Sequence, residues 1–399
     1  MKNWLPIIVL ALICLPAIVL RLLGIYFDPI LEVLVFGVAI LSAAFLLTWA
    51  SEVAETEISA TLALAFLAII AVLPEYAVDL YFAWTAHTTP EHAHFAIANM
   101  TGANRLLVGF AWPVIFFIFW LKTKGRELDV DAKQNGLAII FLAIATVYSF
   151  SIPIRGHLSL IDTFFTFGLF GAYLWFMSRM PPHHVEEFVG PAAVIKALRP
   201  RLRAAALVAI FGFAAVTIFA AAEPFANGLV QTGSKLGVDE FLLVQWLAPL
   251  ASESPEFLLA GLLAARGRPG AAMTILLSSK VSQWTLLIGS IPAAYAISGG
   301  TLSPLNFDAR QAEEVFLTAS QSLFAVAIFV SLSMSYREAI ILALLFTTQL
   351  FFFNTTVRIG YGAAYLLLAV LLLFRDRGTM PLLWRSARES VAKSGVPPP

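Results

Sequence analysis

Two proline-glutamate pairs, each in the middle of a long apolar run, are the residues of this chain best suited to chemistry. They are Pro74-Glu75 and Pro255-Glu256. An ionised side chain at the centre of a bilayer costs about 2.5–3.5 kcal/mol, so intramembrane acids usually serve a pathway or a site. Proline has no N–H, so it leaves a carbonyl oxygen free one turn earlier and should break or kink the helix. A carboxylate beside free carbonyls predicts a cation-binding site.

Further ionisable and polar side chains lie near each pair. Asp79 follows Glu75 by one helical turn, and Ser252 and Glu253 stand just before Pro255. The next apolar run of each half also has a polar centre, formed by Asn99, Gly102, Asn104 and Arg105 in the first half and by Ser278, Ser279, Lys280, Ser282 and Gln283 in the second. Acids outnumber bases in this set, so it requires ion pairing or proton uptake.

The composition predicts an all-α membrane protein. The apolar fraction is 60%, the mean hydropathy is +0.85 and only 13% of the residues are charged, which excludes an ordinary soluble protein. About twelve apolar segments are long enough to span a bilayer. They are centred within 5–25, 29–50, 57–86, 92–121, 136–153, 158–179, 204–230, 238–266, 270–296, 313–333, 337–356 and 359–375.

Basic residues are concentrated in alternate connections between these segments. This bias predicts that both termini lie in the cytoplasm of a multi-pass protein, which we expect in a bacterial inner membrane. The single cysteine, Cys14, excludes an internal disulfide and a thiolate metal site. No nucleotide-binding motif is present, so we expect an ion gradient as the energy source and no nucleotide, nucleic acid or cofactor.

The two halves of the chain resemble each other in order and polarity. We predict an extra N-terminal helix (1–28), a first repeat (29–179), a cytoplasmic linker (180–203), a second repeat (204–356), and an extra C-terminal helix with a basic, mobile tail (357–399). The two Pro-Glu helices should cross the membrane in opposite directions, which places matching centres of inverted repeats face to face. In the linker, His183 and His184 are expected to be solvated rather than metal-bound.

At these residues the chain resembles the calcium/cation antiporter superfamily, whose sodium/calcium and cation/proton exchangers carry two inverted repeats. The family pattern is approximately G-T-S-x-P-E-L followed by G-N-x-x-G-S-N, and the best match here is S-E-S-P-E-F at 252–257. The resemblance implies that Glu75 and Glu256 are the acidic ligands of the cation and that Ser252 is a hydroxyl ligand. Asn99 and Asn104 match the second motif, either as ligands or as interhelical hydrogen-bonding groups.

The departures from the family pattern change the expected cation. Positions that carry a hydroxyl or an amide in the family hold Ala71, Val72, Ala103, Glu253, Ile275 and Lys280. Calcium prefers six to eight oxygen ligands, whereas this site has lost oxygens and gained an ammonium group. We therefore expect a monovalent cation, with sodium as the first candidate.

The sequence thus predicts a secondary active antiporter that exchanges sodium for protons by alternating access. Lys280 is expected between Glu253 and Glu256, where it would couple proton release to cation entry, and Arg105 and Asp79 are further candidates for coupling or counter-ion roles. Asp79 could instead be an outer gate or vestibule charge. Calcium/proton exchange, sodium/calcium exchange and a non-transporting relative locked by Lys280 and Arg105 remain open, as does the oligomeric state. A channel and an intramembrane enzyme are disfavoured, and no catalytic residue is assigned.

Overall fold

The computed structural model describes residues 4–54, 73–180, 188 and 190–392. The chain forms two compact units. The first unit comprises residues 1–82 and 182–255, and the second comprises residues 83–181 and 256–399. Each unit therefore combines a segment from the first half of the chain with one from the second half.

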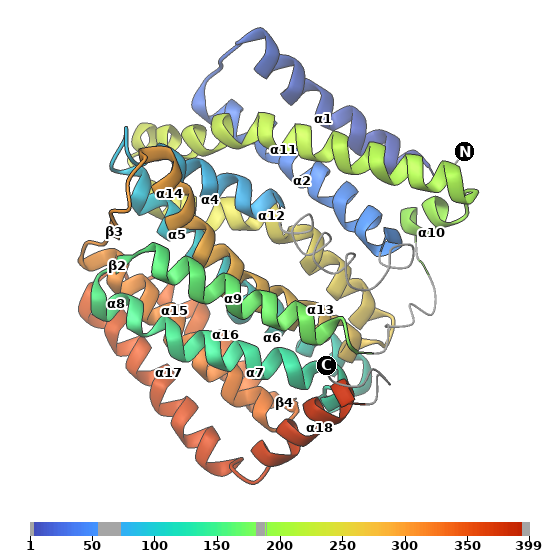
Figure 1. The fold of residues 1–399 in the computed structure, drawn as a ribbon, viewed down its shortest axis with the longest axis vertical. Helices are drawn as coiled ribbons and strands as arrows, with labels where there is room; N and C mark the ends of the chain where they lie inside the picture. The colour runs from blue at the N-terminus through green and yellow to red at the C-terminus, as the bar shows by residue number, and fades with distance from the viewer. Residues whose placement is uncertain (1–3, 55–72, 181–187, 189, 393–399) are drawn as a thin grey trace. The chain divides into compact units, whose positions relative to one another are not determined.

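The first unit is a small bundle of long apolar helices. Its elements are α1 (Leu5–Leu23), α2 (Pro29–Ala54), α10 (Pro191–Lys196), α11 (Pro200–Leu236) and the first parts of α4 (Leu73–Thr85) and α12 (Glu240–Ala265). Helices α1, α2 and α11 pack side by side (Figure 1). Small residues such as Ala43, Ala50 and Ala214 are fully buried among them, which lets the backbones approach closely, as is common between membrane helices.

The turns at one end of the first unit are tied together by charge. Asp28, between α1 and α2, forms an ion pair with Lys235 in the last turn of α11, and this hydrogen bond holds the pKa of the Asp28 carboxyl below its ordinary value. The chain then turns sharply into α12 at Gly237, whose φ is +65°. A side chain at Gly233 would collide with Glu240, so this turn requires glycine.

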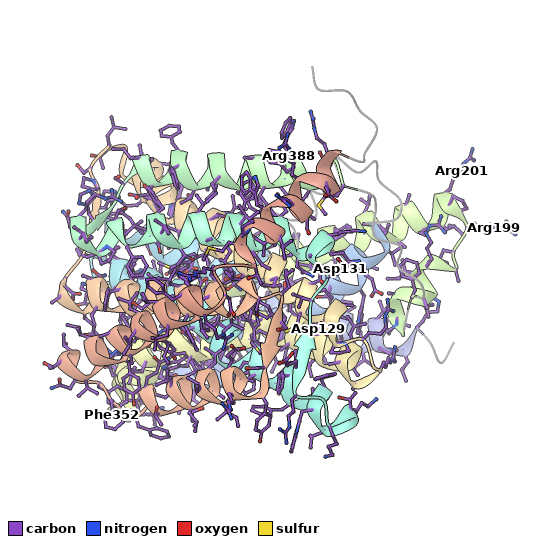
Figure 2. The ribbon with its side chains drawn as sticks, turned by 90° about the horizontal axis from the view of Figure 1, so that it is seen from below. Asp129, Asp131, Arg199, Arg201, Phe352 and Arg388 are labelled. Carbon is purple, nitrogen blue, oxygen red and sulfur yellow. The ribbon has the colours of Figure 1, made fainter. Side chains whose placement is uncertain are left out.

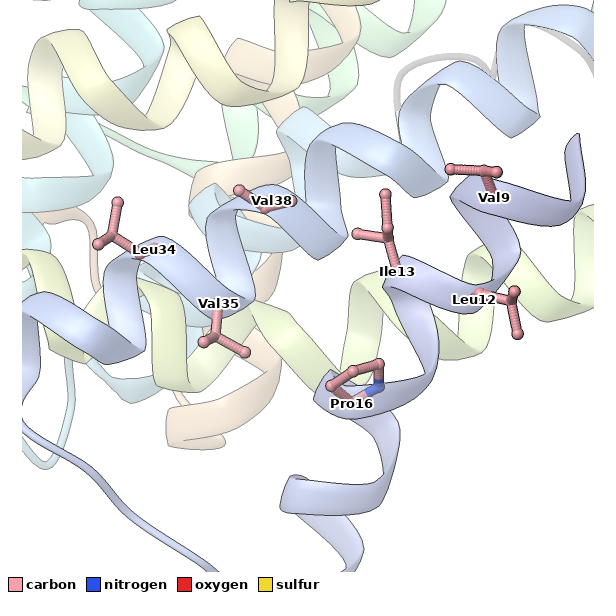
Figure 3. Close-up of a pocket in the computed structure, with 7 residues that line it drawn as sticks. All are labelled: Val9, Leu12, Ile13, Pro16, Leu34, Val35 and Val38. Carbon is pink, nitrogen blue, oxygen red and sulfur yellow. The ribbon is translucent and has the colours of Figure 1, made fainter. Parts of the chain in front are cut away.

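An open apolar groove of about 570 Å³ lies between α1 and α2 (Figure 3). It is lined by Val9, Leu12, Ile13, Pro16, Leu34, Val35 and Val38. None of these side chains offers a polar atom to an ion. The groove suits lipid chains and is not a candidate cation site.

The second unit holds most of the chain. Besides the ends of α4 and α12, it contains α5 (His92–Leu106), η1 (Leu107–Ala111), α6 (Trp112–Thr123), β1 (Glu127–Asp129), α7 (Ala132–Ser149), α8 (Ser151–Arg155), β2 (His157–Leu158), α9 (Leu160–Met177), α13 (Pro269–Ser282), η2 (Gln283–Leu287), α14 (Ile288–Gly299), β3 (Leu305–Asn306), α15 (Ala309–Val330), β4 (Ser333–Ser335), α16 (Tyr336–Gln349), α17 (Thr355–Arg375) and α18 (Met380–Ala392). The segments η1 and η2 are π-helical turns.

Two short antiparallel sheets join connections that are far apart in the sequence. Strand β1 pairs with β4, which links the α6–α7 connection to the α15–α16 connection. Strand β2 pairs with β3 and links the α8–α9 connection to the α14–α15 connection. Because strands that pair must lie at the same end of the bundle, each sheet fixes two connections on one side of the second unit.

Helix α15 lies at the core of the second unit, with α17 packed along it (Figure 1). Most of its apolar and polar residues are buried, and the ring of Phe316 touches the backbone of α17 at Gly362. By contrast, Phe351, Phe352 and Phe353 between α16 and α17 are exposed, and Phe352 points away from the ribbon in Figure 2. Exposed aromatic rings of this kind suit the boundary between lipid and water.

The prediction of an all-α membrane protein is confirmed. Nine helices within the described residues are long and apolar enough to cross a membrane, so the count of about twelve stays a prediction. Helix α12 contains Pro249 and Pro255 and ends at neither. The helix therefore does not break at Pro255, and the alternative, a kink, stays a prediction, since each proline lacks its N–H donor.

The C-terminal tail was expected to be mobile, but residues 380–392 form α18, which packs on α7. Its alternation of apolar and basic residues at helical spacing explains this difference.

Residues 57–72 of the predicted third span, which include Ala71 and Val72, lie outside the described residues. The same holds for His183, His184 and residues 393–399.

Candidate functional site

Helix α12 carries three of the predicted site residues, Ser252, Glu253 and Glu256. Ser252 and Glu253 are buried. The Ser252 hydroxyl donates to the carbonyl oxygens of Ala248 at 3.2 Å and Pro249 at 3.3 Å. Its hydrogen is thus used within its own helix, while its oxygen lone pairs can still face a cation.

Glu256 belongs to the second unit and has a close partner there. The hydroxyl of Ser279, on α13, donates to Glu256 Oε2 at 2.5 Å. A charge-assisted hydrogen bond of this length orients the carboxylate and leaves its other oxygen available. The sequence showed Ser279 in a polar run but did not assign it this role.

Lys280 is fully buried beside Ser279, and it contacts an amide of α5. Its ammonium donates to Asn104 Oδ1 at 2.6 Å and lies 4.4 Å from the centre of the Trp284 ring. The ring face attracts the cation. The sequence predicted Glu253 and Glu256 as the partners of Lys280, and did not anticipate Asn104.

The two asparagines of α5 differ in what they can still bind. Asn104 Nδ2 donates to the Met100 carbonyl at 2.8 Å, and its Oδ1 accepts from Lys280. Asn99 is also buried, yet neither atom of its amide has a hydrogen-bond partner among the described residues. Buried amides normally find a protein or water partner, so Asn99 has more capacity to bind an ion or water than Asn104.

Arg105 follows Asn104 in α5 and pairs with an acid that was not predicted as its partner. Its guanidinium donates to Glu314 Oε2 at 2.5 Å. Arg358, on α17, pairs with both Glu314 and Glu313. The signal in the sequence was the adjacent acid pair Glu313-Glu314 inside an apolar segment, which needs compensating cations in a membrane.

The remaining predicted residues belong to the first unit. Glu75 and Asp79 lie on α4 and are both buried. Helix α4 is anchored within its unit by Tyr81, whose hydroxyl donates to Asn227 on α11 at 3.0 Å. Because Glu256 belongs to the other unit, the convergence of the two glutamates on one cation stays a prediction.

The described residues contain no group of three or more histidine, cysteine or acidic side chains suited to a metal ion. A cation at these helices would therefore need hydroxyl, amide or carbonyl oxygens besides the two glutamates. Such mixed oxygen sets bind hard cations such as calcium and sodium rather than transition metals.

Helices α5 and α13 each pass from an α-helical to a π-helical turn at an equivalent position. The π-helical turn η1 begins three residues after Asn104, and η2 begins three residues after Lys280. Single π-helical turns within α-helices occur frequently at functional sites. Asn104 and Lys280, 176 residues apart, thus occupy matching places and also contact each other.

A family sequence model described as "Sodium/calcium exchanger protein" matches residues 29–179 and 206–355. The chain belongs to this family. Membership makes it a multi-pass membrane protein of the cation antiporter class, whose members are ion exchangers. A search of curated proteins found no match.

Solved structures resemble the exchanger over most of its length. One match is the crystal structure of the H+/Ca2+ exchanger CAX, which shares 41% sequence identity and superposes with a TM-score of 0.94. The match covers 98% of this chain and 99% of that chain. Native YfkE is 16% identical with a TM-score of 0.60, covering 87% and 98%. The sodium-calcium exchanger NCX_Mj is 16% identical with a TM-score of 0.54, covering 82% and 98%. The last two likenesses concern the fold alone.

Proposed function

We propose that this exchanger moves calcium across the membrane in exchange for protons. The observation that carries the proposal is its 41% identity, over nearly its whole length, with a protein described as an H+/Ca2+ exchanger. The chain itself supplies buried acids in proline-containing helices, which suit a cation that must be bound without its water shell.

The ligands in this proposal are Glu75 and Glu256, helped by neutral oxygens. Ser252 and Asn99 retain the capacity to bind, and Pro255 leaves the Ala251 carbonyl without its helical donor. Calcium accepts such mixed sets of carboxylate, hydroxyl, amide and carbonyl oxygens. Two carboxylates can also take up protons when the cation leaves, which gives one route to coupling, and the Lys280 ammonium gives another.

Sodium/proton exchange is the second candidate, and Lys280 is the observation that favours it. A buried ammonium reduces the negative charge available to a divalent ion. However, the Lys280 ammonium donates to the Asn104 side-chain oxygen, so part of its hydrogen-bonding capacity is used by a neutral amide. We rank calcium above sodium because the 41% identical relative is described as an H+/Ca2+ exchanger.

The purified protein in sealed vesicles, loaded with a pH-sensitive dye, tests the proposal. With calcium imposed outside and no sodium present, we expect calcium to enter and the lumen to become more alkaline. A pH response to sodium but not to calcium would replace the proposal with sodium/proton exchange. Calcium uptake that requires sodium in the lumen would indicate sodium/calcium exchange, and the absence of any flux would indicate a non-transporting relative.

A further inference from the structure

Four charged side chains form a buried ion-pair network in the second unit, and only one of them, Arg105, was among the predicted site residues. They are Arg105 on α5, Glu313 and Glu314 on α15, and Arg358 on α17. Arg105 lies 2.5 Å from Glu314, and Arg358 Nε lies 2.6 Å from Glu313. The exposed fractions of these side chains are 6% or less. We call these residues the Arg–Glu network.

Stability alone does not account for this network. Two acids balance two bases, yet buried ion pairs are often no more stabilising than apolar residues of similar size, because each charge loses its hydration. What the network does provide is geometry. A guanidinium presents a rigid set of donors to a carboxylate, so Glu314 is held from two sides by helices α5 and α17.

Arg105 on α5 connects the Arg–Glu network to the candidate site. Arg105 is the residue after Asn104, and Asn104 accepts the hydrogen bond from Lys280. A shift or rotation of α5 that moved Arg105 off Glu314 would move Asn104 with it, because neighbouring residues of one helix move together. The π-helical turn η1 begins immediately after Leu106, so the backbone hydrogen-bond pattern changes directly after Arg105 and its neighbour.

We propose that the Arg–Glu network sets the position of Asn104 and Lys280, and that Arg358 is a positioning residue for cation exchange. Arg358 comes from α17, which begins at Thr355, where the match to the family ends. Helix α17 is held close to α15 at Gly362, where an added Cβ would collide with the Phe316 ring. Helix α17 thus takes part in function although the family match does not include it. The expected effect of Arg358 on cation exchange rests on the proposed function.

The test compares charge-balanced variants. Arg358→Gln alone leaves an uncompensated buried acid and could unfold the protein, so the informative variant is Arg358→Gln with Glu313→Gln, which removes one charge of each sign. Arg375→Gln is the matched control, since Arg375 is on the same helix but pairs with Glu338 and Asp376. In vesicles, we expect the double variant to raise the half-saturating calcium concentration on the order of tenfold, with a smaller change in maximal rate. Arg358→Lys should restore part of the affinity.

A second readout does not depend on which ion is moved. The emission of Trp284, obtained as the difference between each protein and its Trp284→Phe counterpart, reports how Lys280 lies against that ring. We expect the emission to shift in the double variant and not in the control. Lower thermal stability with unchanged half-saturation and unchanged Trp284 emission would overturn the proposal. If the unaltered protein transports no calcium, the proposed function fails while the emission still tests the Arg–Glu network.

Discussion

Glu75 and Glu256 are each expected to supply negative charge to the cation rather than packing. Glu75→Gln or Glu256→Gln keeps the shape of the side chain but removes the charge, so exchange should fall to the rate of protein-free vesicles while the protein stays folded. Glu32→Gln is a suitable control, because Glu32 is a buried acid that accepts a hydrogen bond from the backbone of Phe27. Normal exchange by a well-folded Glu256→Gln protein would contradict the site assignment.

Lys280 is expected to make the exchange sensitive to pH. A cation that enters beside a buried ammonium favours release of the lysine proton, since desolvation and nearby positive charge both disfavour the charged form. Lys280→Gln retains a donor for Asn104 but has no titratable proton, so its exchange rate should vary less with pH. The comparison is the rate from pH 6 to pH 9 against Lys235→Gln, which removes a lysine exposed near a turn. An unchanged pH profile would leave the carboxylates as the proton carriers.

The sequence predicts which single residues belong to the site, but not which residues they contact. The Pro-Glu pairs and the polar centre around Lys280 stood out, because ionisable groups are rare in apolar segments. Their partners could not be predicted, since Arg105 and Glu314 are 209 residues apart and no local spacing relates them. Ser279 was visible as a polar residue, but its bond to Glu256 depends on how α12 packs against α13.

At the scale of an element, η1 is held against α16 through a glycine. A Cβ added at Gly109 would lie 2.3 Å from the ring of Phe346, so Gly109→Ala should push the helices apart. Overpacking of this kind costs about 1–3 kcal/mol, and we expect a lower melting temperature in detergent together with slower exchange. Gly171→Ala on α9 is the control, because an added Cβ there meets no atom within 4 Å. Equal stability of the two variants would argue against close packing at η1.

Helices were predictable where apolar length determines them, and less so where packing decides. The long apolar segments gave α2, α9 and α15 close to their observed bounds. The π-helical turns leave no pattern in a single sequence, because they depend on side chains packed around them. Helix α12 continues through Pro255 since its neighbours hold the chain together despite one missing hydrogen bond. In α18, Met380, Leu383 and Trp384 stand at helical spacing, but the polar and basic residues around them make this pattern weak in the sequence.

At the scale of the whole molecule, the distribution of basic residues predicts that β1 and β4 lie on the cytoplasmic side and β2 and β3 on the opposite side. The protein has one cysteine, Cys14, which is buried, so maleimide labelling of an introduced cysteine can be measured with little background from the native thiol. Asp129, at the end of β1, is exposed (Figure 2), and Leu302, just before β3, is 82% exposed. A membrane-impermeant maleimide applied to intact cells should label Leu302→Cys and spare Asp129→Cys. The reverse pattern would invert the orientation.

The Arg–Glu network also constrains how the protein can be made. Glu313 and Glu314 leave the ribosome well before Arg358, which follows Glu314 by 44 residues. When α15 first reaches the bilayer, Arg105 is therefore the only network cation already synthesised. Two adjacent acids with a single partner resist entry into lipid, so we expect stable insertion of α15 to wait until α17 has been translated. Helix α17 would then complete the membrane insertion of α15, a helix translated before it.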